Sequence, residues 1–212
     1  IYSDEYEPKK GDLFQNMRNF DRDRMVLFDE KNAFDGIAED ELFSVFANSY
    51  LVVLGEELSV KYVKYSNDRA KEYQIRTEIV KEQDEWSVRK YPTSEAAREH
   101  IRNMEKSYAL LKERYADSGL ELNHCSIREN KEELWAEFEF VQGITLLELL
   151  DKCLEQKDLE GFYKYFAEYQ KRIAYGEGSG VSDYDLVFGN VLIDKDKWTL
   201  IDYEWTYEKD IP

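Results

Sequence analysis

Three short segments between residues 58 and 92 alternate apolar with polar side chains, and this alternation constrains the fold more than any other feature. A period of two residues is typical of antiparallel strands with one buried and one solvated face. Turns between the segments are expected at Asn67-Asp68 and Gln83-Asp84, because Asn and Asp favour turn conformations. The predicted strands are Leu58–Tyr65, Tyr73–Val80 and Trp86–Tyr91.

The pattern then changes to helical spacing. Thr93 or Ser94 is expected to cap a long helix that ends near Gly119. Two more strands, over 122–128 and 134–141, would complete a five-stranded antiparallel sheet with one helix after its third strand. Helical patterns follow over 145–156 and 159–175, so the predicted fold class is α+β. The apolar positions of the first helix are Ala97, Ile101, Met104, Tyr108 and Leu111.

Residues 1–55 form a different region. Apolar runs at Arg24–Phe28 and Ser49–Leu54 have the composition of strands, and the stretch from Phe34 to Phe46 between them predicts a short helix. The chain begins without Met and reads as a piece of something longer.

Composition excludes several classes of function. The 212 residues are 42% hydrophobic, which is enough for a sizeable core. A net charge of −17 disfavours nucleic acid, because binding a phosphate backbone needs clustered Lys and Arg. No apolar run approaches the roughly 20 residues of a membrane span. Cys125 and Cys153 match no metal spacing and predict reduced thiols in a cytoplasmic protein.

The C-terminal region contains a pattern of acids suited to phosphoryl transfer. Asp185 is followed by Asn190 on the way into an apolar run, and Asp202 ends the next apolar run. One acid can take a hydroxyl proton, while the Asn and the second Asp can hold Mg²⁺ against nucleotide phosphates. The alternative is turn chemistry, because Asp and Asn are common in loops for conformational reasons alone.

These residues resemble the catalytic loop of small-molecule kinases, the branch of the protein-kinase-like fold that contains aminoglycoside, choline and lipopolysaccharide sugar kinases. The matching residues are Asp185-Leu186 with Asn190, then Ile201-Asp202 with Glu204. The resemblance extends over roughly 58–204. It implies ATP and Mg²⁺ as cofactors and a small-molecule or glycan hydroxyl as acceptor.

The resemblance also assigns roles. Asp185 would be the catalytic carboxylate, and Asn190 and Asp202 would bind Mg²⁺. Lys90 would contact the nucleotide phosphates. Glu105 would pair with Lys90, with Glu99 as second choice. The backbone of 138–141, with Phe140 and Val141, would meet the adenine. A kinase-like N-lobe would span 56–141 and an incomplete C-lobe 142–212.

Two positions depart from that pattern. Asp183 stands where a His or Tyr often precedes the catalytic acid, and it would repel phosphates unless it points away. The loop from Ser66 to Lys71, expected to fold over the phosphates, has no glycine to bring backbone amides close.

Residues 1–55 are similar to the closing β-hairpin of a class I S-adenosylmethionine-dependent methyltransferase. Together the two resemblances imply a methyltransferase domain in the same parent protein and a role in bacterial surface-polysaccharide or other glycan modification. Three interpretations stay open: an ATP- and Mg²⁺-dependent phosphotransferase, a catalytically inactive kinase-like binding module attached to a methyltransferase, and a structural accessory with solvated acids. The aromatic residues between 162 and 169 are either helix core or a sugar platform.

Overall fold

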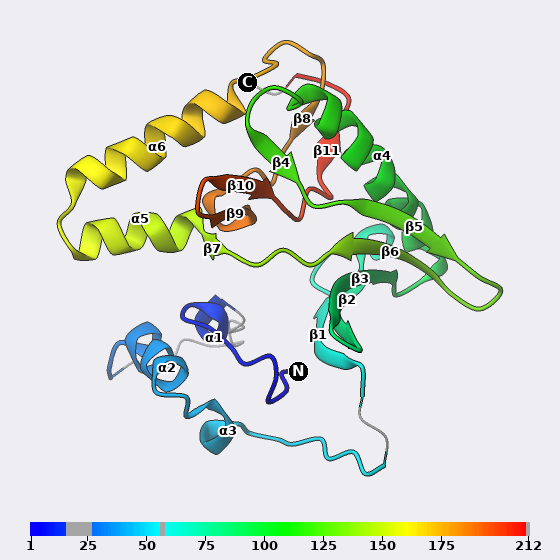
Figure 1. The fold of residues 1–212 in the computed structure, drawn as a ribbon. Coiled ribbons are helices and arrows are strands. Elements are labelled where there is room, and N and C mark those ends of the chain that lie inside the picture. The colour runs from blue at the N-terminus through cyan, green and yellow to red at the C-terminus, as the bar shows by residue number, and fades with distance from the viewer. Residues whose placement is uncertain (16–26, 56–57, 211–212) are drawn as a thin grey trace.

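The computed structural model describes residues 1–15, 27–55 and 58–210 (Figure 1). Its largest sheet has five strands in the order β1-β2-β3-β6-β5, and every neighbouring pair is antiparallel. This confirms the predicted five-stranded sheet. Its strands are β1 (Val60–Ser66), β2 (Ile75–Glu82), β3 (Glu85–Pro92), β6 (Leu134–Glu139) and β5 (Cys125–Glu129).

The β2–β3 hairpin turns where the sequence predicted. Glu82 pairs with Glu85, so Gln83 and Asp84 form the connection, and Gln83 has a φ of 59°. The same register places Lys90 opposite Thr77, near the open end of the hairpin.

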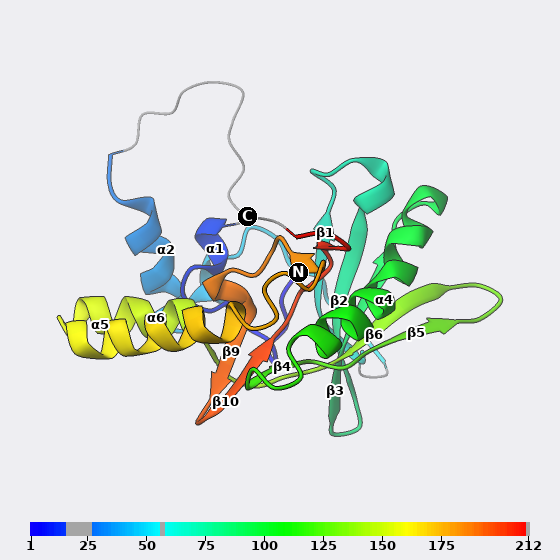
Figure 2. The same cartoon turned by 90° about the horizontal axis from the view of Figure 1, so that it is seen from above.

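Helix α4 (Arg98–Arg114) follows β3 and covers one face of the sheet, as Figures 1 and 2 show. Its start differs from the prediction, because the short 3₁₀ turn η2 (Glu95–Ala97) precedes it and neither predicted cap bonds to the helix. The hydroxyl of Thr93 donates to the carbonyl of Gln74, and that of Ser94 donates to the carbonyl of Lys71. Both side chains therefore tie the helix entry to the 3₁₀ turn η1 (Lys71–Tyr73).

A second sheet has the order β4-β10-β9-β7, formed by β4 (Leu120–Leu122), β10 (Lys197–Leu200), β9 (Val191–Asp194) and β7 (Ile144–Thr145). The single strand predicted over 122–128 was wrong: the chain breaks at Asn123-His124, and β4 pairs in parallel with β10 while β5 joins the first sheet. At this break Asn123 is hydrogen-bonded to both sheets. Its N–H donates to the carbonyl of Leu200 in the second sheet, and its side-chain amide donates to the carbonyl of Glu139 in the first.

The predicted C-terminal helices are present as α5 (Leu146–Glu155) and α6 (Leu159–Ile173), which meet at their short connection and diverge from it in Figure 1. Thr145 and Asp158 cap them by accepting backbone N–H groups. A short pair, β8 (Ser182–Asp183) with β11 (Thr206–Tyr207), then brings the end of the chain back beside 182–185.

The region before residue 55 differs most from expectation. It contains α1 (Asp12–Gln15), α2 (Glu30–Glu39) and α3 (Phe43–Phe46). The predicted strand at Ser49–Leu54 is wrong, because these residues pair with no strand in the described chain and Tyr50 to Leu54 are 49–91% exposed. Most of the other predicted strand, Arg24–Phe28, lies outside the described residues.

The main core lies between α4, the first sheet and the second sheet. Fully buried side chains from all three meet there, among them Ile101, Leu111, Ala136, Val191 and Leu200. Within the described ranges, no helix is long and apolar enough to cross a membrane.

Candidate functional site

The acidic motif residues lie on two segments that the second sheet holds together. Asp185 and Asn190 precede β9, and Asp202 and Glu204 follow β10. The N–H of Ile201 donates to the carbonyl of Asn190 at 2.8 Å, which fixes the two segments side by side. Asp202 has a φ of 58°, a conformation rarely adopted by residues other than Gly, Asn and Asp. The turn at Asp202 directs the chain out of the sheet.

Asn190 orders the loop that contains Asp185. Its side-chain amide donates to the main-chain carbonyl of Asp185 at 2.8 Å, and its own N–H donates to Val187 at 3.0 Å. This use of the amide N–H leaves the side-chain carbonyl oxygen of Asn190 available as a ligand.

Lys90 connects β3 of the first sheet to this motif. Its ammonium group pairs with Asp202 and lies 3.5 Å from Glu204. Burial alone would lower the pKa of Lys90, but Asp202 and Glu204 outweigh it and hold that pKa above its usual value. Lys90 therefore keeps a positive charge at this site.

The expected pairing of Lys90 with Glu105 does not form. The Glu105 carboxylate instead accepts the N–H of Ile127 at 3.1 Å, so it faces the edge strand β5 rather than β3. Glu99, the second choice, is exposed. Helical geometry explains the error: His100, Ile101 and Met104 form the buried stripe of α4, and Glu105 lies beside it.

Glu204 is the most buried acid of the cluster, with 8% of the residue exposed. Arg69, from the loop between β1 and η1, contacts one carboxylate oxygen at 2.5 Å, and His100 lies 3.4 Å from the other. Burial raises the pKa of Glu204, but Lys90, His100 and Arg69 together bring it well below the usual range. Glu204 is therefore a buried carboxylate with cationic partners from separate elements.

Burial and neighbouring carboxylates change the acidity of Asp183 and Asp185. Burial raises the pKa of Asp183 to about 7. The carboxylate accepts the backbone N–H of Asp185 at 3.3 Å, and this hydrogen bond lowers the pKa by less than burial raises it. Burial and the charge of Asp202 also raise the pKa of Asp185. Asp183 is thus partly protonated near neutral pH, which reduces the phosphate repulsion expected of an extra acid.

Aromatic side chains surround the Glu204 end of the cluster. The indole of Trp205 lies 5.0 Å from the Tyr73 ring and 5.4 Å from the His100 ring, and the guanidinium of Arg69 lies 5.4 Å from its centroid. The carbonyl of Trp205 accepts the N–H of Tyr184, next to Asp185. The loop after β1 therefore closes onto the segment that carries the acids.

Phe140 and Val141 follow β6 and are half-buried. The ring of Phe140 lies 5.5 Å from the ring of Trp86 on β3, at a tilt of 32°, which places it beside the first sheet. Gly143 passes so close to β9 that an added Cβ would meet the Ile193 carbonyl oxygen at 3.1 Å. The segment 140–143 thus connects the two sheets.

The donor set fits a magnesium ion in kind. Asp202 offers a carboxylate, 41% exposed, and Asn190 offers an amide oxygen. Mg²⁺ prefers oxygen ligands and is usually bound through few protein groups. Among the described residues, no group of three or more His, Cys, Asp or Glu side chains is arranged to hold a metal. A site here would therefore need oxygen atoms from a nucleotide or from water.

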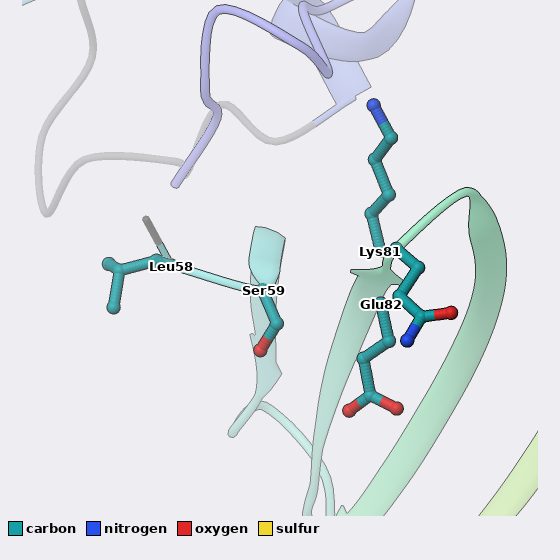
Figure 3. Close-up of a pocket in the computed structure, with 5 residues that line it drawn as sticks. Leu58, Ser59, Lys81 and Glu82 are labelled. Carbon is teal, nitrogen blue, oxygen red and sulfur yellow. The ribbon is translucent and has the colours of Figure 1, made fainter. Parts of the chain in front are cut away.

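A surface pocket lies elsewhere. Figure 3 shows this cavity of about 390 Å³, where β1 begins and β2 turns into β3. Its lining residues on this hairpin are about 13–20 Å along the strand from Thr77, the partner of Lys90, given a rise of about 3.3 Å per residue. It does not contribute to the acidic cluster. Its lining residues are Leu58, Ser59, Lys81, Glu82 and Gln83.

Sequence reasoning missed Arg69 and His100. His100 had a detectable signal, because it is a polar residue on the apolar face of a helix, next to Ile101 and Met104. Arg69 had none, since its approach to Glu204 depends on how the loop folds across 135 residues of sequence separation.

No protein-family model matches the chain, and no curated protein matches it. Among solved structures, a variant of the PknI kinase domain of Mycobacterium tuberculosis is similar over 73% of this chain, with 12% identity and a TM-score of 0.39. The PknI kinase domain itself gives 13% identity and the same TM-score. This chain covers 63% and 62% of those chains, less than two thirds of their length. Because this similarity is partial, the kinase-like arrangement stays a prediction.

Proposed function

We propose that this chain is an ATP- and Mg²⁺-dependent phosphotransferase acting on a hydroxyl of a small molecule or glycan. The observation that carries the proposal is the convergence of Lys90, Asp202 and the Asn190–Asp185 loop, which come from segments far apart in sequence. A lysine, a carboxylate, an amide oxygen and a second carboxylate are the groups that phosphoryl transfer needs.

Each residue has a distinct task in this proposal. Asp202 and Asn190 would hold Mg²⁺, and Lys90 would contact the phosphates. Asp185 would orient the acceptor hydroxyl and take its proton, and its raised pKa favours that task because it brings the carboxylate closer to the operating pH. When bound, the magnesium nucleotide would supply the phosphoryl group and neutralise its charge.

The second candidate is a catalytically inactive kinase-like binding module attached to a methyltransferase. The loop after β1 favours it: the loop contains no glycine, and Arg69 holds it against Glu204. A loop closed in this way offers fewer backbone amides to a nucleotide. The glycan context and the methyltransferase partner rest on the sequence resemblance alone.

A thermal-shift titration with ATP, with and without Mg²⁺, tests the first proposal. A ligand at 100 times its Kd stabilises a protein by about 2.7 kcal/mol, which is a shift of a few degrees at this size. We expect a Mg²⁺-dependent shift that Asp202→Ala removes. Asp194→Ala, which removes an exposed acid at the end of β9, is the matched control and should retain the shift.

A folded wild-type chain with no shift at millimolar ATP and Mg²⁺ would contradict the phosphotransferase proposal. If nucleotide binds and the wild-type chain transfers no phosphoryl group to water or a sugar, the binding-module alternative gains support instead.

A further inference from the structure

Helix α4 reaches the candidate site through a histidine. His100 is 7% exposed, and its Nε2 lies 3.4 Å from Oε2 of Glu204. Both atoms are buried, and neither makes a hydrogen bond within the described ranges. In the Nε2–H tautomer, His100 is thus placed to donate to a carboxylate oxygen that lacks a donor.

The partners of Glu204 divide its two oxygens. Arg69 holds Oε1 at 2.5 Å, whereas Oε2 lies between His100 at 3.4 Å and Lys90 at 3.5 Å. A buried carboxylate oxygen without a donor is costly, so Glu204 must turn toward whichever donors remain. Removal of the imidazole N–H would turn Oε2 toward Lys90.

Such a turn would change the balance around Lys90. Its ammonium group now pairs with Asp202 while Glu204 lies at 3.5 Å. A closer Glu204 would draw the ammonium group away from Asp202, the carboxylate proposed to hold Mg²⁺. His100 thus acts on the site through Glu204 and Lys90, without needing to touch a nucleotide.

We propose that His100 is a positioning residue that holds Glu204 and, through it, the direction of Lys90. The inference rests on the proposed function for its effect on nucleotide affinity. The positioning of Lys90 by His100 concerns only the ligand-free protein, so it can be tested separately from nucleotide binding.

The experiment compares His100→Leu, His100→Gln and Glu99→Gln in this chain. Leu fills space without a donor, whereas the Gln amide restores an N–H toward Glu204. Glu99 is the exposed neighbour of His100 on α4, so its substitution is the matched control. The first measurement is the ¹⁵N–¹H signal of the Lys90 ammonium group without nucleotide, assigned by its loss in Lys90→Arg.

We expect the Lys90 signal to shift in His100→Leu and to stay near its wild-type position in His100→Gln and Glu99→Gln. The second measurement is the Kd of Mg²⁺-ATP by calorimetry. Substitution of a residue that holds a ligand-binding side chain in place typically costs about 10–100-fold in affinity. We expect the Kd of His100→Leu to rise by that factor, with most of the rise recovered in His100→Gln.

An unchanged Lys90 signal in His100→Leu would overturn the inference. Equal shifts in the Leu and Gln variants would also overturn it, because ring packing against Tyr73 and Trp205 would then explain both. If wild type binds no nucleotide, the proposed function fails while the Lys90 signal still decides the positioning role. Should His100→Leu not fold, His100→Asn, whose shorter amide stops short of Glu204, decides in the same assay.

Discussion

Lys90 on β3 pairs with Asp202 beyond β10, and the two residues are 112 positions apart in sequence. Asp202 is partly exposed, but Glu204, the other acid near Lys90, is buried. Loss of the lysine would therefore leave a buried carboxylate with one cation fewer, which is far more costly than loss of a surface pair.

We expect Lys90→Met to lower the free energy of unfolding by about 3–5 kcal/mol. Urea unfolding followed by circular dichroism measures it. Lys64→Met, an exposed lysine on β1, should change it by less than about 0.5 kcal/mol. Adding Glu204→Gln to Lys90→Met should recover part of the lost unfolding free energy. A double variant that loses more unfolding free energy than the two single variants together would contradict this account.

Asn190→Ala should affect both order and binding. It removes the 2.8 Å bond to the Asp185 carbonyl, which should cost about 1 kcal/mol of unfolding free energy, and it removes a proposed Mg²⁺ ligand. We expect the Mg²⁺-dependent part of ATP binding to disappear in calorimetry while the protein stays folded. An Asn190→Ala protein that binds Mg²⁺-ATP as wild type does would exclude Asn190 as a ligand.

Asp183 should make the stability of the protein depend on pH. Its folded pKa of about 7 lies above the ordinary 3.8, so the folded state binds a proton that the unfolded chain releases. The contribution to stability is complete below pH 3.8 and is lost as the pH rises through 7.

Asp183→Asn removes that dependence. We expect it to match wild type near pH 4 and to be more stable by on the order of 2–4 kcal/mol at pH 8. The difference between the two unfolding free energies, measured from pH 4 to 8, isolates this group from other titrations. A difference independent of pH would show that Asp183 titrates normally.

Gly143 should be intolerant of a side chain. A Cβ there would meet the Ile193 main chain at 3.1 Å, and backbone within a sheet cannot move aside cheaply. Gly143→Ala should destabilise the protein by about 1–3 kcal/mol. Gly36→Ala is the control: an added Cβ meets nothing within 4 Å, and Ala favours helix α2, so stability should be unchanged or higher. Similar melting temperatures for both variants would contradict the steric explanation.

Local patterns predicted much of this fold. The strand alternation from residue 58, the turn at Gln83-Asp84 and the helical spacing from Ala97 all depend on neighbours in sequence, and the structure confirms each. The strand expected at Ser49–Leu54 did not form, because a local pattern cannot show whether a partner strand exists, and strand-forming side chains make a strand only where one does.

Contacts between distant segments were less predictable. In the structure Lys90 pairs with Asp202 and Asn190 bonds to Asp185, but the roles that the family resemblance gave these residues stay predictions. Which residue of α4 faces inward depends on the rotation of the helix about its axis. A shift of one residue in sequence separates the exposed Glu99 from the buried His100.

β4 has a mechanical consequence. It is followed closely by β5 of the first sheet, yet it is hydrogen-bonded in parallel to β10 of the second. The two sheets are therefore joined at two crossings, at 123–124 and at 140–143, and two joints define one axis. Relative motion of the sheets would be confined to a hinge-like opening about the line through both crossings, whereas twisting of one sheet against the other would be resisted.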